Sequence, residues 1–322
     1  MARCGACPRP TSASTRLSHV SATQVVEPEE TFDWDSLGRG RVLPDDLLSI
    51  AGLGVDLGEA ERARLSREEL ASMLASGIRF EAILEAAFAV ELAETRRLGD
   101  PRHTYMLHEI AEESRHQRAF LRLHERLAPR ARNPFDARVP RFVARRVTRL
   151  LLRRRALFCV MLLAGEEIPD LLQKIASEHP GTDPLVRAVN RYHRQEEARH
   201  LAFARAVFEE RWALSGPVER WQVRHLAPVL VRMLFDTMLH PGVYETVGLP
   251  GFRTWRAANR TPGRLAVRYR ATRPILDVLC RHGALSRGRI PRAWRSLCGV
   301  DRHGDPLPGD PPLPGAGAPA VA

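Results

Sequence analysis

The chain has 322 residues, enough for one large domain or two small ones, and a formal net charge of +11. Hydrophobic residues make up 44% and charged residues 27%, which excludes wholesale disorder. The longest apolar run, 156–164, is far shorter than the roughly 20 residues of a membrane helix, and the N-terminus lacks the apolar core of a signal peptide. We therefore expect a cytoplasmic protein without a membrane partner.

The positive charge is weak support for nucleic-acid binding. Lys174 is the one lysine among 49 basic residues, a bias typical of a GC-rich genome. Aromatic residues are only 6% and do not alternate with basic ones as in a base-stacking surface. Five scattered cysteines do not form a disulfide framework, and the pair Cys4 and Cys7 resembles half a zinc site without a second pair. The role of that pair is left open.

The pattern along the chain indicates one helical domain between two irregular ends. Residues 1–40 lack periodicity and are expected to form a disordered arm. Residues 41–300 have helical periodicity without strand-like alternation, which predicts a single all-α domain. Within it, a metal-binding core is expected at about 65–215 and extra helices at about 216–300. The Pro- and Gly-rich end, 301–322, is expected to be a disordered tail.

Helix starts are indicated by capping residues. Ser66 and Glu69 have the spacing of a capping box, which predicts the start of the first long helix. Asp100 and Asp183 are each followed by proline, an N-cap with proline at the first helical position, and predict the second and fourth. Pro169 falls inside the third. The expected helices are 66–97, 100–128, 140–177 and 183–212, with further helices at 218–238 and 264–285.

A five-residue pattern, Glu-Glu-x-Arg-His, occurs twice, at 112–116 and 196–200. Glu and His three positions apart share one face of a helix, so they can converge on a metal. One such pair is expected by chance at this composition, but both copies follow an Asp-Pro helix start by the same distance to within one residue. The candidate ligands are the second Glu and the His of each pattern: Glu113 and His116, and Glu197 and His200.

An acidic residue precedes each pattern at a matching distance. Glu81 lies 32 residues before Glu113, and Glu166 lies 31 before Glu197. In an antiparallel helix hairpin this spacing brings both carboxylates to the same depth. Two such hairpins form a four-helix bundle with the ligand set of ferritin-like dimetal proteins. Four buried carboxylates are also costly without cations, which favours two divalent ions.

Two ligand assignments have a close competitor. Glu85 lies one turn after Glu81, but its spacing of 28 to the motif breaks the match with the second hairpin, so Glu81 is preferred. Glu166 is preferred to its neighbour Glu167 on the same ground. The first Glu of each pattern is rotated by about 100° from the second and is expected to point away from the site: Glu112 and Glu196.

A further histidine lies on the ligand face of the fourth helix. His193 precedes Glu197 by four residues, one turn along the same face. It would point into the dimetal cavity, and imidazole is a common iron ligand. We therefore expect His193 to be a seventh ligand.

With these seven positions in order, and the run Glu-Ala-Ile-Leu-Glu-Ala-Ala-Phe after position 80, the sequence resembles the p-aminobenzoate N-oxygenase (AurF-like) family of diiron enzymes. The resemblance covers about 65–215 and implies a ferritin-like core whose site uses four Glu and three His. Pro169, which could kink the third helix, is a departure. The metal ligands that the resemblance implies are Glu81, Glu113, His116, Glu166, His193, Glu197 and His200.

The resemblance also implies a function. Two iron ions, or alternatively a manganese–iron pair, would activate O₂ to oxidise a small organic substrate, by N-oxygenation of an arylamine. Because the sequence has no Gly-x-Gly-x-x-Gly or P-loop motif, electrons would come from an external donor or reductase. A homodimer is one option. The alternatives are a ferritin-like protein that binds or oxidises iron without an organic substrate, and a basic nucleic-acid-binding helical protein.

Overall fold

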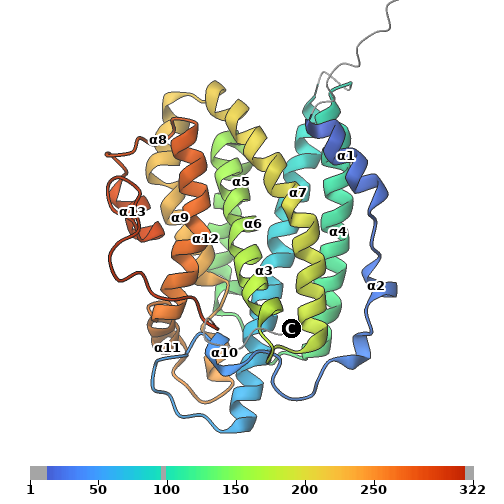
Figure 1. The fold of residues 1–322 in the computed structure, drawn as a ribbon, viewed down its shortest axis with the longest axis vertical. Helices are drawn as coiled ribbons and strands as arrows, with labels where there is room; N and C mark the ends of the chain where they lie inside the picture. The colour runs from blue at the N-terminus through green and yellow to red at the C-terminus, as the bar shows by residue number, and fades with distance from the viewer. Residues whose placement is uncertain (1–12, 96–98, 316–322) are drawn as a thin grey trace, which may run out of the picture.

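The protein is an all-α bundle with additional helices after it, as the sequence predicts. The structure is a computed structural model and describes residues 13–95 and 99–315. No β-strand forms in those residues. α3 pairs with α4 and α6 with α7 to give the four-helix core (Figure 1). These helices are α3 (Glu59–Glu94), α4 (Pro101–Leu127), α6 (Arg155–Glu178) and α7 (Pro184–Leu214).

The two Asp-Pro starts are confirmed. The Asp100 carboxylate accepts a hydrogen bond from the backbone N–H of Arg102 at 3.0 Å, and α4 begins at the intervening proline. The Asp183 carboxylate likewise accepts from the N–H of Leu185 at 2.9 Å at the start of α7. Both caps satisfy amide donors that the first helical turn cannot pair internally.

The predicted capping box at Ser66 is wrong, because α3 begins seven residues earlier. The Glu61 side chain accepts from the N–H of Gly58 at 2.8 Å and caps the true start. Ser66 instead accepts from the N–H of Val42, and the Glu69 carboxylate accepts from the N–H of Ser49 at 3.0 Å. Both side chains therefore hold the segment that precedes α3, which a local capping rule does not consider.

The third predicted helix is two helices, α5 (Arg138–Arg153) and α6. Arg154 separates them with φ −123° and ψ 87°, outside the helical region. The break frees backbone amides at the start of α6, and the Glu219 carboxylate accepts from the N–H of Ala156 at 2.7 Å and from that of Leu157 at 3.3 Å. A residue 63 positions away thus stabilises a helix start that has no local signal. α6 continues through Pro169.

The segment before residue 41 is ordered where it is described. α1 (Ala13–Thr23) packs against α4 (Figure 1), and α2 (Pro28–Thr31) follows it. Trp34 is buried and its indole N–H donates to the carbonyl of Pro28. Residues 13–40 thus differ from the expected disordered arm, because their few apolar side chains pack on the bundle. Cys4 and Cys7 lie outside the described residues.

The chain after the bundle forms a second set of helices. α12 packs along α6, and α13 packs on α12 and α9. Residues 301–315, expected to be disordered, pack on α12 through contacts such as the ion pair of Arg273 with Asp310. The helices are α8 (Pro217–His225), α9 (Ala227–Thr237), α10 (Gly242–Glu245), α11 (Gly251–Ala258), α12 (Pro262–Arg281) and α13 (Arg292–Cys298).

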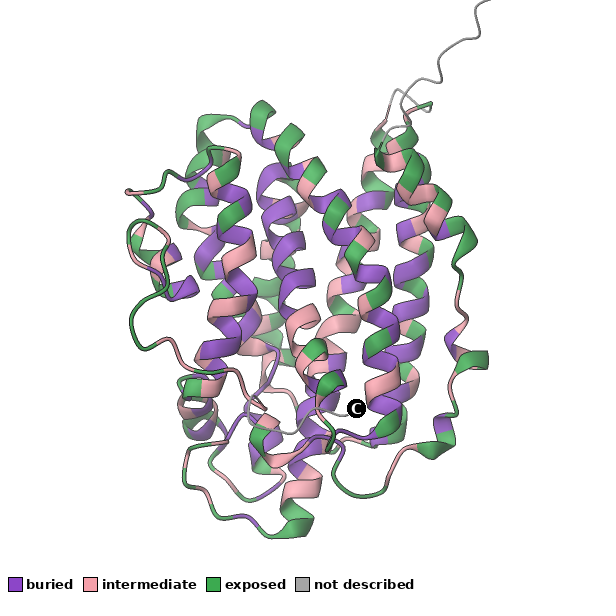
Figure 2. Cartoon of the chain, viewed as in Figure 1, coloured by how far each residue is buried: buried purple, intermediate pink, exposed green. Residues whose placement is uncertain are grey.

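In the described part of the chain, the core consists of two apolar clusters at different levels of the bundle. One takes Leu84 and Phe88 of α3, and the other takes Leu65, Leu70 and Leu74 of the same helix. The other three core helices divide in the same way. Figure 2 shows the buried residues concentrated along α6 and the surfaces that face it. Polar side chains lie between the two clusters. None of the described helices is long and apolar enough to span a membrane.

Candidate metal centre

All seven predicted ligands meet between the two apolar clusters. Each of the four core helices contributes at least one, and none of the seven is more than 3% exposed. α4 and α7 supply a Glu and a His one turn apart, so their side chains leave each helix on the same face. By helix, the residues are Glu81 of α3, Glu113 and His116 of α4, Glu166 of α6, and His193, Glu197 and His200 of α7.

The carboxylates of Glu113 and Glu197 lie centrally, each close to both His116 and His200. Nδ1 of His116 is 2.9 Å from Glu113 and 3.4 Å from Glu197. Nδ1 of His200 is 3.0 Å from Glu113 and 3.3 Å from Glu197. His193 uses its other nitrogen, with Nε2 3.1 Å from Glu197. These two carboxylates therefore lie at the centre of the group of residues that would hold the metal ions.

The donor set fits a pair of metal ions. Ligand atoms from all seven residues fall into overlapping groups in which every atom lies within 4.8 Å of the others. Leaving a buried polar atom unpaired costs about 1–3 kcal/mol, so such a concentration of unpaired ligand atoms favours the binding of cations. Carboxylate oxygen and imidazole nitrogen are suitable ligands for iron and manganese. Among the described residues, buried atoms without a hydrogen-bond partner include Oε2 of Glu81, Oε1 of Glu113, Oε1 of Glu166, Nε2 of His193, both carboxylate oxygens of Glu197 and Nδ1 of His200.

Without metal, the cluster distributes its protons to stay close to neutral. Burial opposes charge everywhere, but the carboxylates raise the pKa of His116 to about 9 and that of His200 well above its usual value. The same imidazoles hold the pKa of Glu113 at about 2 despite its burial. Burial and the neighbouring carboxylates raise the pKa of Glu81 and Glu166, which favours the neutral, protonated form of both acids. Two imidazolium groups thus face two carboxylates.

The prediction that Glu112 and Glu196 point away from the site is half right. They do not join the seven ligands, but they are buried and bind the far nitrogens of the histidines across the helix pair. Nε2 of His200 is 2.8 Å from Glu112, and Nε2 of His116 is 2.9 Å from Glu196. Each motif therefore orients the histidine of the other, leaving Nδ1 directed at the cluster. Such partners fix the ring and raise its basicity.

Three supporting residues were not predicted. Arg199 donates to Glu112 at 2.7 Å, and Arg115 lies 3.6 Å from Glu196, so the arginine of each motif neutralises an outer carboxylate. Gln173 lies 2.8 Å from Nδ1 of His193 and leaves Nε2 to face the cluster. The repeated arginine was a usable signal for the first two. Gln173 is 20 residues from its partner, and no local pattern points to it.

The competing ligand candidates lie outside the cluster. Glu85 accepts a hydrogen bond from Gln117 at 2.7 Å. Glu167 pairs with Arg205 at 2.5 Å. Neither has a ligand atom among the grouped donors, whereas Glu81 and Glu166 do. Glu85 lies one turn after Glu81 and Glu167 lies one residue after Glu166, and these displacements are enough to give each carboxylate a partner outside the cluster.

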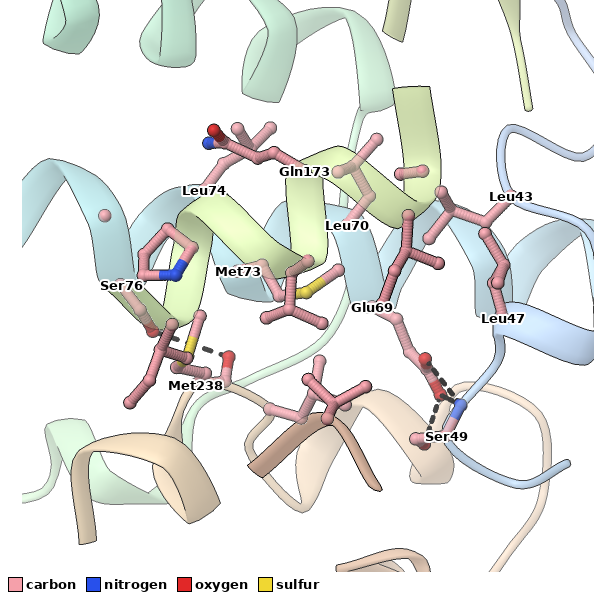
Figure 3. Close-up of a pocket in the computed structure, with 18 of the residues that line it drawn as sticks. Leu43, Leu47, Ser49, Glu69, Leu70, Met73, Leu74, Ser76, Gln173 and Met238 are labelled. Carbon is pink, nitrogen blue, oxygen red and sulfur yellow. Dashed lines mark hydrogen bonds between the residues drawn. The ribbon is translucent and has the colours of Figure 1, made fainter. Parts of the chain in front are cut away.

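A cavity that is partly open to solvent adjoins the candidate metal centre, and Glu81 and His193 line it. Its walls are mostly apolar, with Leu70, Leu74 and Met73 of α3 among them (Figure 3). Figure 3 also shows the Glu69 carboxylate bound to Ser49, and burial raises the pKa of Glu69 to about 7 although Ser49 opposes this. The cavity thus has an apolar body with a few polar groups, which is typical of a small-molecule site.

Comparison with known proteins gives several relatives and a family. An uncharacterized protein of Mycobacterium bovis and two of Mycobacterium tuberculosis are each 30% identical over 144 residues, which is 44% of this chain and 42% of each relative. The chain thus aligns with less than half the length of these relatives. The family described as p-aminobenzoate N-oxygenase AurF matches residues 8–283, most of the chain. The chain therefore belongs to the p-aminobenzoate N-oxygenase AurF family, whose fold is a helical, ferritin-like diiron bundle.

Proposed function

We propose that the protein is a diiron oxygenase that uses O₂ to oxidise a small organic amine, by N-oxygenation of an arylamine. The observation that carries the proposal is the cluster of seven buried Glu and His residues with unpartnered ligand atoms beside an apolar cavity. Family membership supports an oxidoreductase. A basic nucleic-acid-binding protein would not need such a cluster.

The chain contributes binding, orientation and exclusion of water. When bound, two Fe(II) ions supply the electrons and open coordination positions with which O₂ is activated. Glu112 and Glu196 hold two imidazoles in one tautomer, and Gln173 does so for His193. The cavity can place an aromatic amine beside Glu81 and His193. Further electrons then come from an external donor.

Iron binding can be tested with a matched pair of variants on α3. Glu81→Ala removes a grouped ligand, whereas Glu85→Ala removes a carboxylate one turn away that lies outside the cluster. After anaerobic loading with Fe(II), we expect about two irons per chain in the wild type and in Glu85→Ala, and a clear loss in Glu81→Ala. Equal iron content in both variants would overturn the ligand assignment.

Turnover distinguishes an oxygenase from an iron-oxidising protein. The reduced, iron-loaded protein is mixed with ¹⁸O₂ and p-aminobenzoate as the first amine tested, with a chemical reductant present. Label in a hydroxylamine or nitro product supports the proposal. Oxidation of the iron with no labelled product from this or a panel of arylamines favours the ferritin-like alternative.

A further inference from the structure

Residues 310–315 pack on α12 through specific contacts. The two terminal nitrogens of Arg273 donate to the two carboxylate oxygens of Asp310, each at 2.8 Å. Arg270 donates to the carbonyl oxygen of Pro311 at 3.1 Å, and Leu313 packs against the apolar core. A paired arginine–carboxylate contact fixes direction as well as position. This segment therefore has a defined place on the bundle although it contains no helix.

Beyond that anchor, the segment reaches the cavity beside the metal centre. Pro314 is one of the residues that line it. A Cβ atom at Gly263 of α12 would lie 3.5 Å from the Pro314 ring. A Cβ at Gly315 would lie 3.0 Å from the ring of His179 and 3.5 Å from Leu47. The segment thus contacts α12 on one side and, on the other, the chain around residue 47, which also lines the cavity.

The composition of the segment suits a cavity wall. Proline has no N–H group, so Pro314 presents an apolar ring to the cavity without leaving a donor unpaired. Gly315 has φ +75°, a conformation that glycine adopts without strain, and its lack of a side chain allows the approach to His179. These residues follow position 283, where the match to the family ends.

We propose that residues 310–315 form a wall of the substrate cavity and determine which ligands it holds and how quickly it releases them. The proposal rests on the proposed function only in taking this cavity as the substrate site. Its anchor is the ion pair of Asp310 with Arg273, and its contact with ligand is made through Pro314.

The first test compares two tryptophan substitutions, one inside the segment 310–315 and one a few residues before it. Pro314→Trp places a large ring in the cavity, whereas Leu307→Trp changes a residue that is 47% exposed and does not line it. The probe is 1-N-phenylnaphthylamine, a neutral apolar amine whose fluorescence rises on binding, titrated into the iron-loaded protein. We expect Pro314→Trp to weaken binding about tenfold and Leu307→Trp to leave it within about twofold. Equal affinities in the two variants, or no saturable binding by the wild type, would overturn the proposal.

The second test loosens the anchor. Asp310→Ala removes the two-contact ion pair with Arg273. As a control on the same helix, Asp277→Ala removes an exposed, single-contact ion pair with Arg287, at 2.9 Å. Stopped-flow release of the probe should be about threefold or more faster in Asp310→Ala and unchanged in Asp277→Ala. Identical release rates would contradict the proposal. Iron content is measured on the same samples. If two irons are bound but the variants bind and release the probe like their controls, the proposed role of residues 310–315 is refuted and the proposed function is not. If the variants differ from their controls but the protein binds no iron, the proposed function is refuted and the role of residues 310–315 is not.

Discussion

Loading two Fe(II) ions into the site should release about four protons at pH 7. In the metal-free cluster, two buried carboxylic acids and two imidazolium groups hold the protons that iron must displace. The pKa of His116 is about 9, so this ring is almost fully protonated at pH 7. Two Fe(II) ions add four positive charges, and the four released protons remove four. The exchange leaves the buried cluster with its charge unchanged, which is what a site in apolar surroundings requires.

The sign of the pH dependence follows from the raised pKa values. Ligands must be deprotonated, so iron affinity rises with pH until the raised pKa values are passed. Below them, the affinity for the pair of ions should change by up to about four decades per pH unit. Anaerobic titration calorimetry in two buffers of different ionisation enthalpy measures the number of protons released. Measured again at pH 6 and pH 8, the affinity gives the slope.

Two variants test the assignment of the protons. Burial lowers the pKa of His193 to about 3, so this ring is already neutral and His193→Ala should release the same number. Glu81→Gln removes one of the two neutral acids and should lower the number by about one. Release of fewer than about two protons by the wild type, or an unchanged number in Glu81→Gln, would refute the reasoning.

Two further predictions concern the side chains around the site. Glu196→Gln keeps the size of the side chain that contacts His116 but removes its charge. Iron affinity, measured by anaerobic competition with a chelator, should fall about 10–100-fold. An iron affinity equal to that of the wild type would contradict the orienting role of Glu196. Gly165→Ala would place a Cβ 1.7 Å from the Phe80 ring and should destabilise the protein by about 1–3 kcal/mol in urea unfolding. Gly77→Ala is the control, because its Cβ would lie at an ordinary 3.4 Å from the Phe120 ring, and it should be neutral or stabilise the protein by up to about 1 kcal/mol. Equal destabilisation by the two substitutions would contradict the packing argument.

The sequence was most informative where one helix carries the whole signal. The Asp100 and Asp183 starts depend on residues next to them, and both are confirmed. The convergence of Glu113 with His116, and of Glu197 with His200, needs only the helical repeat. Placing Glu81 at the same level of the bundle as Glu113 required one further assumption, that their two helices form an antiparallel hairpin with a short turn.

The sequence was least informative where partners are distant. Ser66 and Glu69 have the spacing of a cap, yet a segment some 20 residues earlier uses both side chains. The start of α6 after the break at Arg154 is capped by Glu219, which no local pattern connects to it. Glu112 is rotated away from its own metal-facing neighbour, and the rotation directs it toward a histidine of another helix. Local periodicity predicts the direction in which a side chain leaves its helix, but not the residue that it contacts.

The exchange of orienting partners between α4 and α7 makes the two hairpins dependent on each other. A fragment that contained α3 and α4 alone would keep Glu81, Glu113 and His116, but Nε2 of His116 would lose Glu196. The complementary half would lose the partner of His200 in the same way. Neither half carries a finished coordination unit, so the centre is completed only when both hairpins have docked in register. A partly unfolded chain would therefore bind metal weakly, and metal binding would indicate that the bundle is assembled.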